Sequence, residues 1–190
     1  KQSAWSKFKV KCNHFSESDI NQLLQFNKNI ALDSNGSFTA EECHWLENNE
    51  LISKFTYLEQ PMKKGVEQYS GLHSKMYANW MADEDCQDLT VLEDLIPHYK
   101  SINIKLVKCG GLTPGRRMIQ EAKRLGLRTM AGCMTESTVG ISAIAHILPE
   151  LDYVDMDGPL LLSEDIASGV TMEFGKISYA EGNGTGVHLF

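Results

Sequence analysis

Several features that mark special classes of protein are missing from this 190-residue sequence. It has no run approaching the ~18 consecutive apolar residues that a membrane-spanning helix needs. Its 18 basic side chains are outnumbered by 25 acidic ones, and the resulting net charge of −7 argues against a nucleic-acid-binding surface. Hydrophobic residues nevertheless make up 42% of the chain, which is enough to form a core and excludes a disordered protein.

Cysteine is also scarce, and its spacing excludes a zinc knuckle. The five cysteines stand at positions 12, 43, 86, 109 and 133, so that no two have the close spacing of paired zinc ligands. An odd number of cysteines without a secretory signal is typical of a reducing compartment. We therefore expect reduced, buried thiols and a cytoplasmic protein.

Short apolar segments alternate with amphipathic ones along most of the chain. The expected strands are 8–12, 29–33, 55–59, 79–83, 102–106, 128–132 and 153–157. The expected helices are 16–27, 39–48, 66–76, 89–98, 113–125 and 137–148. This alternation predicts an α/β fold with parallel strands and right-handed crossovers, in either an open sheet or a closed barrel. The G-x-G-x-x-G sequence of a dinucleotide-binding sheet is absent.

Seven strands are one fewer than a β/α barrel contains, and such barrels usually have ~250 residues. We expect residues 1–160 to form a partial barrel, strands two to eight, without the first strand and whatever precedes it. The pattern changes over residues 161–190, where 169–190 is typical of a β-hairpin. The Gly-Asn-Gly-Thr-Gly run at 182–186 is expected to be a turn, because no helix follows it as in a phosphate-binding loop.

An ionisable residue ends each of five successive strands: Lys11, Asp33, Glu59, Asp83 and Lys105. Each is separated from the next by the length of one βα unit. In a parallel barrel the carboxyl ends of the strands open at one mouth, where active sites of this fold lie. Three carboxylates gathered there would need a cation, and oxygen ligands of this kind suit Mg²⁺. Any one of these residues could end a strand only because strands end at the surface, but the regular series favours a functional site.

With their neighbours, these residues resemble the strand-end motifs of the enolase superfamily, most closely its muconate-lactonising subgroup. The motifs are Lys9-Val10-Lys11, Asp33-Ser34-Asn35, Glu59-Gln60-Pro61, Asp83-Glu84-Asp85 and Asn103-Ile104-Lys105. Two further stretches, Gly132-Cys133-Met134-Thr135-Glu136-Ser137 and Asp155-Met156-Asp157-Gly158-Pro159, resemble the dipeptide epimerases, whose best-known members are L-Ala-D/L-Glu epimerases. The resemblance extends over nearly the whole chain.

The resemblance implies a TIM-type (β/α)7β barrel and a proton transfer at the α-carbon next to the C-terminal carboxylate of a dipeptide. Asp33, Glu59 and Asp83 would hold one Mg²⁺, which stabilises the enediolate that forms when the α-proton leaves. Lys11 and Lys105 would act as base and acid on opposite faces of the α-carbon, as lysines do in enolase-type sites. The base must be neutral, so its pKa has to fall from ~10.4 toward ~7–8.

The resemblance also assigns substrate contacts. Lys9 would contact the substrate carboxylate and, with the metal, lower the pKa of the catalytic base. Cys133 would lie against the substrate, through its backbone. Asp155 and Asp157 alternate along one strand and so point to the same side, where they would bind the free ammonium group of the dipeptide.

Three residues near the expected site have less certain roles. Glu136 could contact the substrate or cap the helix that begins near it. Lys108 lies beyond the end of its strand and is interpreted as a loop charge. Asp85 stands where the family usually has serine and adds negative charge near the third metal ligand.

Several alternatives stay open. The superfamily also includes o-succinylbenzoate synthase, N-acylamino-acid racemase and muconate-lactonising enzymes, whose substrates lack a free ammonium group. A non-catalytic barrel that keeps the metal site is the alternative from another class. The family has an N-terminal capping domain that closes the site, and residues 161–190 resemble the segment that returns to it. We expect the chain without that domain to be inactive. The sequence identifies neither the dipeptide nor whether the chain forms a homo-oligomer.

Overall fold

The computed structural model describes residues 4–26 and 28–190, and its main feature is one curled parallel sheet. The sheet contains β1 (Lys7–Lys11), β2 (Asn29–Asp33), β3 (Leu58–Glu59), β4 (Trp80–Ala82), β5 (Ser101–Ile104), β6 (Arg128–Gly132) and β7 (Tyr153–Asp155). Each strand pairs in parallel with the next in the chain. The predicted α/β barrel is therefore confirmed as a partial barrel, and β1 and β7 form its edges within the described residues.

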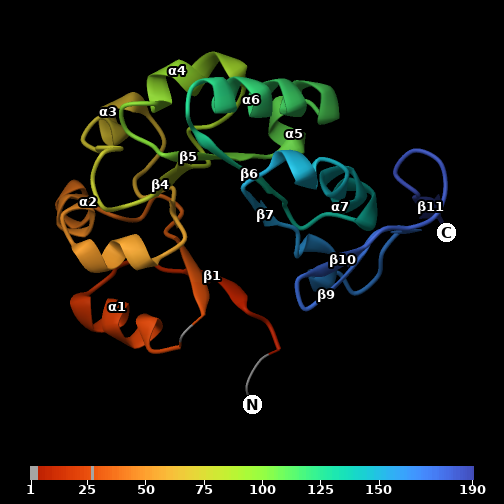
Figure 1. Ribbon diagram of the computed structural model, residues 1–190, viewed down its shortest axis with the longest axis horizontal. Helices are drawn as coiled ribbons and strands as arrows, with labels where there is room; N and C mark the ends of the chain where they lie inside the picture. Colours follow the sequence, from red (N-terminus) through yellow and green to blue (C-terminus); the bar gives the residue numbers. More distant parts are fainter. Residues whose placement is uncertain (1–3, 27) are drawn as a thin grey trace.

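Helices cover the outer side of the curled sheet (Figure 1). They are α1 (Glu17–Leu24), α2 (Ala40–Glu47), α3 (Val66–Tyr69), α4 (Leu92–Leu95), α5 (Leu106–Cys109), α6 (Leu112–Arg124) and α7 (Thr138–Ala145). Short 3₁₀ turns occupy Glu50–Lys54, Leu89–Val91, Leu148–Glu150 and Gly158–Leu161. Helix α1 begins at a capping box formed by Ser16 and Asp19, and α2 at one formed by Thr39 and Glu42. Both starts agree with the sequence pattern, because these caps are local features.

Alternation of side chains along the strands divides the interior into two clusters. On β2, Ile30 and Leu32 join the main core between the sheet and the helices, whereas Ala31 points into the curl. The inner cluster consists of Ala31, Tyr57, Met81 and Met130, with Tyr153 packed against it. It fills the barrel interior below the charged strand ends, and we call it the apolar floor.

Several elements are shorter than the sequence predicted. Of the predicted helix 66–76 only α3 forms, and Gly71 lies in the turn that follows it. The predicted helix 89–98 is divided into a 3₁₀ turn and α4, and it ends before Pro97. Leu106, predicted to end a strand, begins the one-turn helix α5 instead. The sequence pattern did not predict this helix, which lies directly at the mouth of the barrel.

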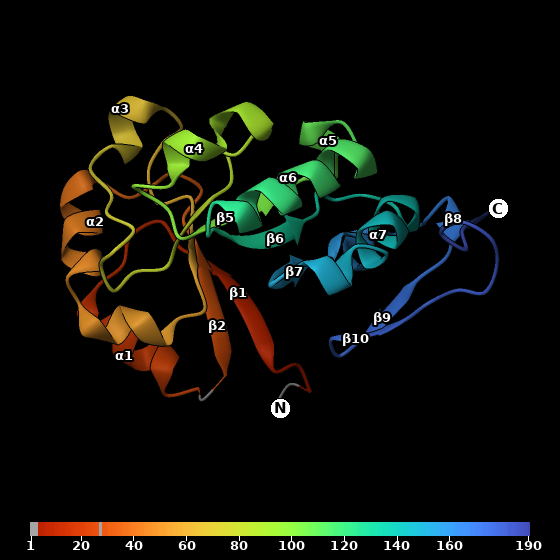
Figure 2. The same cartoon turned by 45° about the horizontal axis from the view of Figure 1, so that its top comes forward.

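The predicted C-terminal hairpin is only partly correct. Strands β9 (Thr171–Glu173) and β10 (Lys176–Ser178) do form an antiparallel hairpin. The last strand, β11 (His188–Leu189), instead pairs with β8 (Ala167–Ser168). Residues 182–186 lie in the irregular loop before β11, so the prediction of a turn is confirmed. Figure 2 shows this tail on the α7 side of the molecule, far from α2. Its role in meeting a capping domain stays a prediction.

In the described part of the chain, no helix combines the length and the apolar character that crossing a bilayer would require.

Gly158 provides a test of how tightly the end of β7 is packed. A Cβ at this position would lie 2.4 Å from the carbonyl oxygen of Met134, a backbone atom that cannot move freely. We expect Gly158→Ala to lower the free energy of unfolding by about 1–3 kcal/mol, the usual cost of overpacking. Gly71→Ala is the matched control, because nothing lies within 4 Å of its Cβ position. Equal stability of both variants in urea denaturation would contradict the described packing.

Candidate active site

The carboxyl ends of the strands bring the predicted charged residues to one mouth of the barrel. The parallel register pairs Lys11 with Asp33 and Asp33 with Glu59, so these three lie side by side. Glu59 pairs with Met81, two residues before Asp83, which places Asp83 one inward-facing position further along. The predicted row of three carboxylates therefore exists, with a step between its second and third members.

The three carboxylates are almost inaccessible to solvent, with Asp33 2%, Glu59 1% and Asp83 1% exposed. Each is turned toward a lysine ammonium. The contacts run from Lys11 Nζ to Asp33 Oδ2 (2.5 Å), Lys9 Nζ to Glu59 Oε2 (3.2 Å) and Lys105 Nζ to Asp83 Oδ2 (2.7 Å). Because each acid has its own ammonium partner, the three do not form a close cluster of possible ligand atoms. The one group of that kind in the described chain is Cys133, Asp155 and Asp157, within 4.8 Å of one another.

The pKa values of Glu59 and Asp83 are shifted in opposite directions, although both carboxylates are buried. Burial and the nearby charges of Asp33 and Asp83 raise the pKa of Glu59 to about 7, although Lys9 opposes the shift. Burial also disfavours the ionised form of Asp83, but hydrogen bonds from Lys105 and Lys108 outweigh it and lower its pKa. Additional positive charge beside Glu59, at the centre of the row, would therefore stabilise its ionised form.

Lys108 is a site residue and not the loop charge that the sequence analysis predicted. Its Nζ lies 2.7 Å from Asp83 Oδ1, so that Asp83 accepts from Lys105 and Lys108 through different oxygens. Helix α5 causes this arrangement, because one helical turn brings the position three residues after Lys105 back to the same side. The three-residue spacing was a signal in the sequence, but only if a helix had been recognised there.

Two amide side chains that the sequence analysis did not assign support the row. Asn103 is fully buried and donates from Nδ2 to Glu59 Oε1 at 2.7 Å, while its Oδ1 has no partner among the described residues. Gln60 accepts hydrogen bonds at Oε1 from the backbone N–H groups of Asp83 and Asp85. Gln60 also adopts a positive φ of 37°, a strained conformation that its hydrogen bonds hold in place.

Asp85 does not add free charge to the mouth, contrary to expectation. Its carboxylate accepts from Gln60 Nε2 at 2.7 Å, the Tyr99 hydroxyl at 2.9 Å and the backbone N–H of Gly65 at 2.9 Å. Through these three hydrogen bonds, Asp85 fixes the loops that follow β3 and β4. Its role is therefore structural.

Lys9 connects the row to the far edge of the barrel. Its ammonium contacts Asp155 on β7 as well as Glu59, and it lies 3.7 Å from Asp33. Burial lowers the pKa of Lys9, but Glu59 and Asp155 outweigh this and raise it, so these carboxylates stabilise the charged form of Lys9. The two edges of the open sheet are thus linked through this one side chain.

Cys133, Asp155 and Asp157 lie together at the ends of β6 and β7. Burial and the charge of Asp155 raise the pKa of Asp157 above its ordinary value. Burial and Asp155 also raise the pKa of the Cys133 thiol to about 11, so the thiol is neutral. The backbone N–H of Cys133 donates to the Asp155 carbonyl, and the Cys133 thiol lies 3.9 Å from Asp157 Oδ1, to which it donates.

Glu136 does not cap α7, one of the two roles that the sequence analysis considered, and its contact with a substrate stays a prediction. Its Oε1 accepts from the backbone N–H of Met134 at 3.0 Å, within the loop before α7. The N-terminus of α7 is instead bonded by Asp165, which accepts from the backbone N–H and the hydroxyl of Thr138. Glu136 therefore shapes this loop and caps no helix.

The sequence matches the family described as "Enolase C-terminal domain-like" over residues 1–189. An L-Ala-D/L-amino acid epimerase from Flavobacterium johnsoniae is 48% identical over 193 residues, covering 97% of this chain and 56% of that protein. A protein of the same description from a Maribacter species is 40% identical over 199 residues, covering 100% of this chain and 57% of that protein. The chain thus spans about half the length of the curated relatives it matches.

A solved structure of a dipeptide epimerase is also similar to this chain. The dipeptide epimerase from Methylococcus capsulatus, complexed with Mg and the dipeptide L-Arg-D-Lys, has a TM-score of 0.85 at 28% identity and covers 98% of this chain and 56% of its own. The resemblance to dipeptide epimerases of the muconate-lactonising subgroup that the strand-end motifs predicted is confirmed.

The raised pKa of Glu59 predicts how stability depends on pH in metal-free protein. The ordinary value is 4.5 and the folded value is about 7, so the folded state holds this proton more tightly than the unfolded state. Stability associated with Glu59 is therefore complete below about pH 4.5 and is lost as pH rises to about 7. Glu59→Gln should remove this loss when the free energy of unfolding is measured across that interval.

Glu67→Gln, at an exposed position on α3, is the control and should keep the slope of the unmodified protein. If Glu59→Gln keeps that slope as well, the burial of Glu59 does not control the pH dependence.

Proposed function

The chain belongs to the enolase C-terminal domain-like family, and we propose that it supplies the catalytic barrel of a Mg²⁺-dependent dipeptide epimerase. The observation that carries the proposal is the position of two lysines at either end of a row of buried carboxylates. Lys11 contacts Asp33 and Lys105 contacts Asp83, with Glu59 between them. This arrangement offers one cation site flanked by two amines, which is what a proton transfer between two faces of one carbon needs.

Asp33, Glu59 and Asp83 are the residues that we propose to hold Mg²⁺. Their donors fit the ion, because carboxylate oxygens are its preferred protein ligands and three of them leave positions for water and substrate. The raised pKa of Glu59 supports the assignment, since burial and its acidic neighbours call for more positive charge at this point. When bound, the ion would supply the charge that stabilises the enediolate form of the substrate.

Lys11 and Lys105 are the proposed base and acid. In one direction the neutral amine of one lysine takes the α-proton, and the ammonium of the other gives a proton to the opposite face of the same carbon. The two lysines exchange roles in the reverse direction. Burial lowers the pKa of Lys105, but its hydrogen bond to Asp83 outweighs burial and raises it. Withdrawal of Asp83 into the metal site would remove that bond, so that burial then favours the neutral amine.

Asp155 and Asp157 are proposed to bind the free ammonium group of the dipeptide. Asp155 already holds one ammonium group, that of Lys9, which supports its ability to bind a cation. The pKa of Asp157 is raised by burial and by Asp155, so a second cation beside the pair would stabilise its ionised form. We propose Lys9 and Cys133 as further substrate contacts, and dipeptides of the L-Ala-D/L-Glu type, in line with the curated relatives named L-Ala-D/L-amino acid epimerase.

A segment outside this chain is proposed to close the site. The Lys11 side chain is 63% exposed whereas that of Lys105 is 13% exposed, so the β1 side of the mouth has less cover. Large apolar side chains of the tail are exposed as well: Leu160, Leu161, Ile166, Leu189 and Phe190. Experiments on activity therefore need the full-length protein. All five cysteines carry free thiols, on which we base the cytoplasm as the proposed location.

Deuterium exchange tests the two-lysine chemistry directly. Full-length protein incubated with Mg²⁺ and L-Ala-L-Glu or L-Ala-D-Glu in D₂O should introduce deuterium at the α-carbon of the second residue and form the other epimer. Lys11→Met and Lys105→Met should each abolish epimerisation, because one face then lacks its proton donor or acceptor. Each variant should still exchange deuterium into one of the two epimers, and the two variants should prefer opposite epimers.

Lys7→Met is the matched control, because Lys7 lies on the same strand as Lys11 but below the mouth. It should retain both reactions. Epimerisation that survives in Lys105→Met would rule out the proposed pair of lysines.

The acidic pair at β7 separates dipeptide epimerisation from the related reactions whose substrates lack an ammonium group. Asp155→Asn/Asp157→Asn in the full-length protein should reduce dipeptide turnover by at least about a hundredfold, because the substrate loses charge-assisted contacts. Mg²⁺ affinity, measured by calorimetry, should stay unchanged. Asp94→Asn, at an exposed position on α4, should affect neither. Unchanged turnover in the double variant would mean that another group binds the ammonium.

A further inference from the structure

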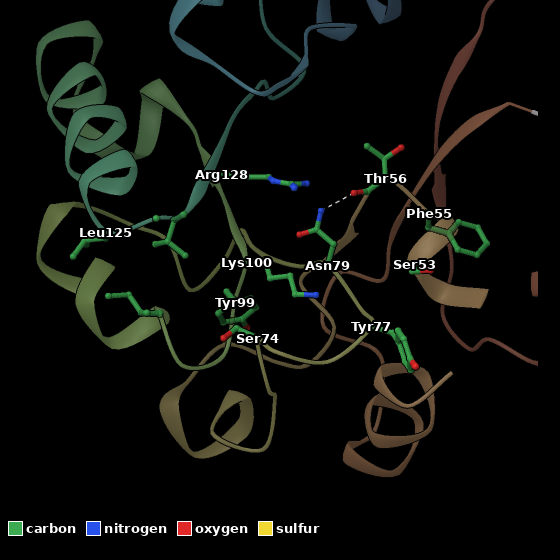
Figure 3. A pocket seen from close by; sticks show the side chains of 13 residues that line it. Ser53, Phe55, Thr56, Ser74, Tyr77, Asn79, Tyr99, Lys100, Leu125 and Arg128 are labelled. Atoms are coloured by element: carbon green, nitrogen blue, oxygen red, sulfur yellow. Dashed lines mark hydrogen bonds between the residues drawn. The ribbon is translucent and has the colours of Figure 1, made fainter. Parts of the chain in front are cut away.

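A cavity lies at the opposite end of the sheet from the catalytic mouth. It has a volume of about 560 Å³, within the ~300–1000 Å³ that small-molecule sites occupy. Thr56, Asn79 and Lys100 precede β3, β4 and β5, and Arg128 begins β6, so the cavity is formed where these strands start. We call it the basal groove. Figure 3 shows Lys100 and Arg128 reaching from adjacent strands into the space around Asn79.

The basal groove concentrates positive charge without matching negative charge. Lys100 and Arg128 both line it, and none of the described residues that line it is acidic. Neither cation forms an ion pair within the described chain, in contrast to the lysines of the catalytic mouth. This is unusual for a protein whose net charge is −7.

The polar contacts of the two cations leave most of their donors available. Lys100 Nζ donates to the Met76 carbonyl, and Arg128 Nη1 donates to the Tyr153 hydroxyl at 2.9 Å. The negative charge of Asp152 contributes to raising the pKa of Arg128. The Asp152 carboxylate accepts from the backbone N–H of Thr129 at 2.8 Å, however, and Asp152 does not line the groove. Both hydrogen bonds of the cations are with neutral groups, so no carboxylate bonds directly to either charge among the described residues.

The two charges are close enough to repel each other. Burial and the positive charge of Arg128 both lower the pKa of Lys100. A bound anion would relieve this repulsion and also replace the water that burial removes. Arginine offers a planar pair of donors that fits phosphate or carboxylate oxygens, and lysine adds a point charge.

We propose that the basal groove binds a small phosphate monoester, with its phosphate group between Lys100 and Arg128. A phosphate monoester carries a charge of about −1.5 to −2 at pH 7, which matches two cations better than a single carboxylate does. Ile96 and Leu125, which are half-buried, give the groove apolar surface for the organic part of such a ligand. The groove is separate from the catalytic mouth, so this proposal does not depend on the proposed epimerase activity.

Calorimetric titration of the full-length protein with phenyl phosphate and with inorganic phosphate tests the proposal. We expect saturable binding of both, with phenyl phosphate binding more tightly because the apolar surface contacts its ring. Lys100→Gln and Arg128→Gln should each weaken binding by about tenfold or more, as the loss of a charged hydrogen bond predicts. Arg128→Lys, which keeps the charge but not the planar donor pair, should lose less than Arg128→Gln.

Two controls locate the binding. Lys176→Gln removes the same charge from an exposed position on β10 and should bind as the unmodified protein does. Lys105→Met removes an ammonium from the catalytic mouth and should also leave the affinity unchanged. Absence of saturable binding, equal affinity in a Lys100→Gln/Arg128→Gln variant with an unchanged circular-dichroism spectrum, or loss of binding in Lys105→Met would overturn the proposal. Equal affinity for the two probes would overturn the assignment of an organic ester.

Discussion

The burial of three carboxylates in one row is the constraint on which the rest of the mouth depends. Like charges in a water-poor interior are costly unless positive charge is brought to them. Here Lys9, Lys11, Lys105 and Lys108 bring it, from strands on both sides of the row and from α5. A divalent ion would perform the same neutralisation from one point. The lysines would then be released to act on a substrate, so the charge balance of the metal-free state is directly related to the proposed chemistry.

The apolar floor and two amide side chains support this row of carboxylates. The apolar floor of Ala31, Tyr57, Met81 and Met130 excludes water from below. Gln60 fixes the backbone that carries Asp83, and Asn103 fixes Glu59 from the neighbouring strand. Gly132 leaves room for the Asn103 side chain, because a Cβ at position 132 would lie 2.4 Å from that side chain. The proposed catalytic role needs charged groups that are preorganised, and the amides provide this without adding charge.

The sequence predicted the parts of this site that depend on one repeating distance. Each βα unit places its last strand residue at the same mouth, so Asp33, Glu59 and Asp83 could be identified from their spacing alone. Lys108 could not, because its position depends on the one-turn helix α5, which is too short to leave a periodic pattern. The basal groove was also hidden, since Lys100 and Arg128 are 28 residues apart and meet only through the pairing of β5 with β6. Long-range contacts of this kind require the folded sheet.

The proposed metal site is the central claim, and thermal unfolding of the full-length protein with increasing Mg²⁺ tests it most directly. An ion that binds only the folded state raises the melting temperature in a saturable way. We expect such a rise, from one Mg²⁺ site per chain, and its loss in Asp33→Asn/Asp83→Asn. A melting temperature that does not respond to Mg²⁺, or that rises equally in this variant, would contradict the proposed metal site.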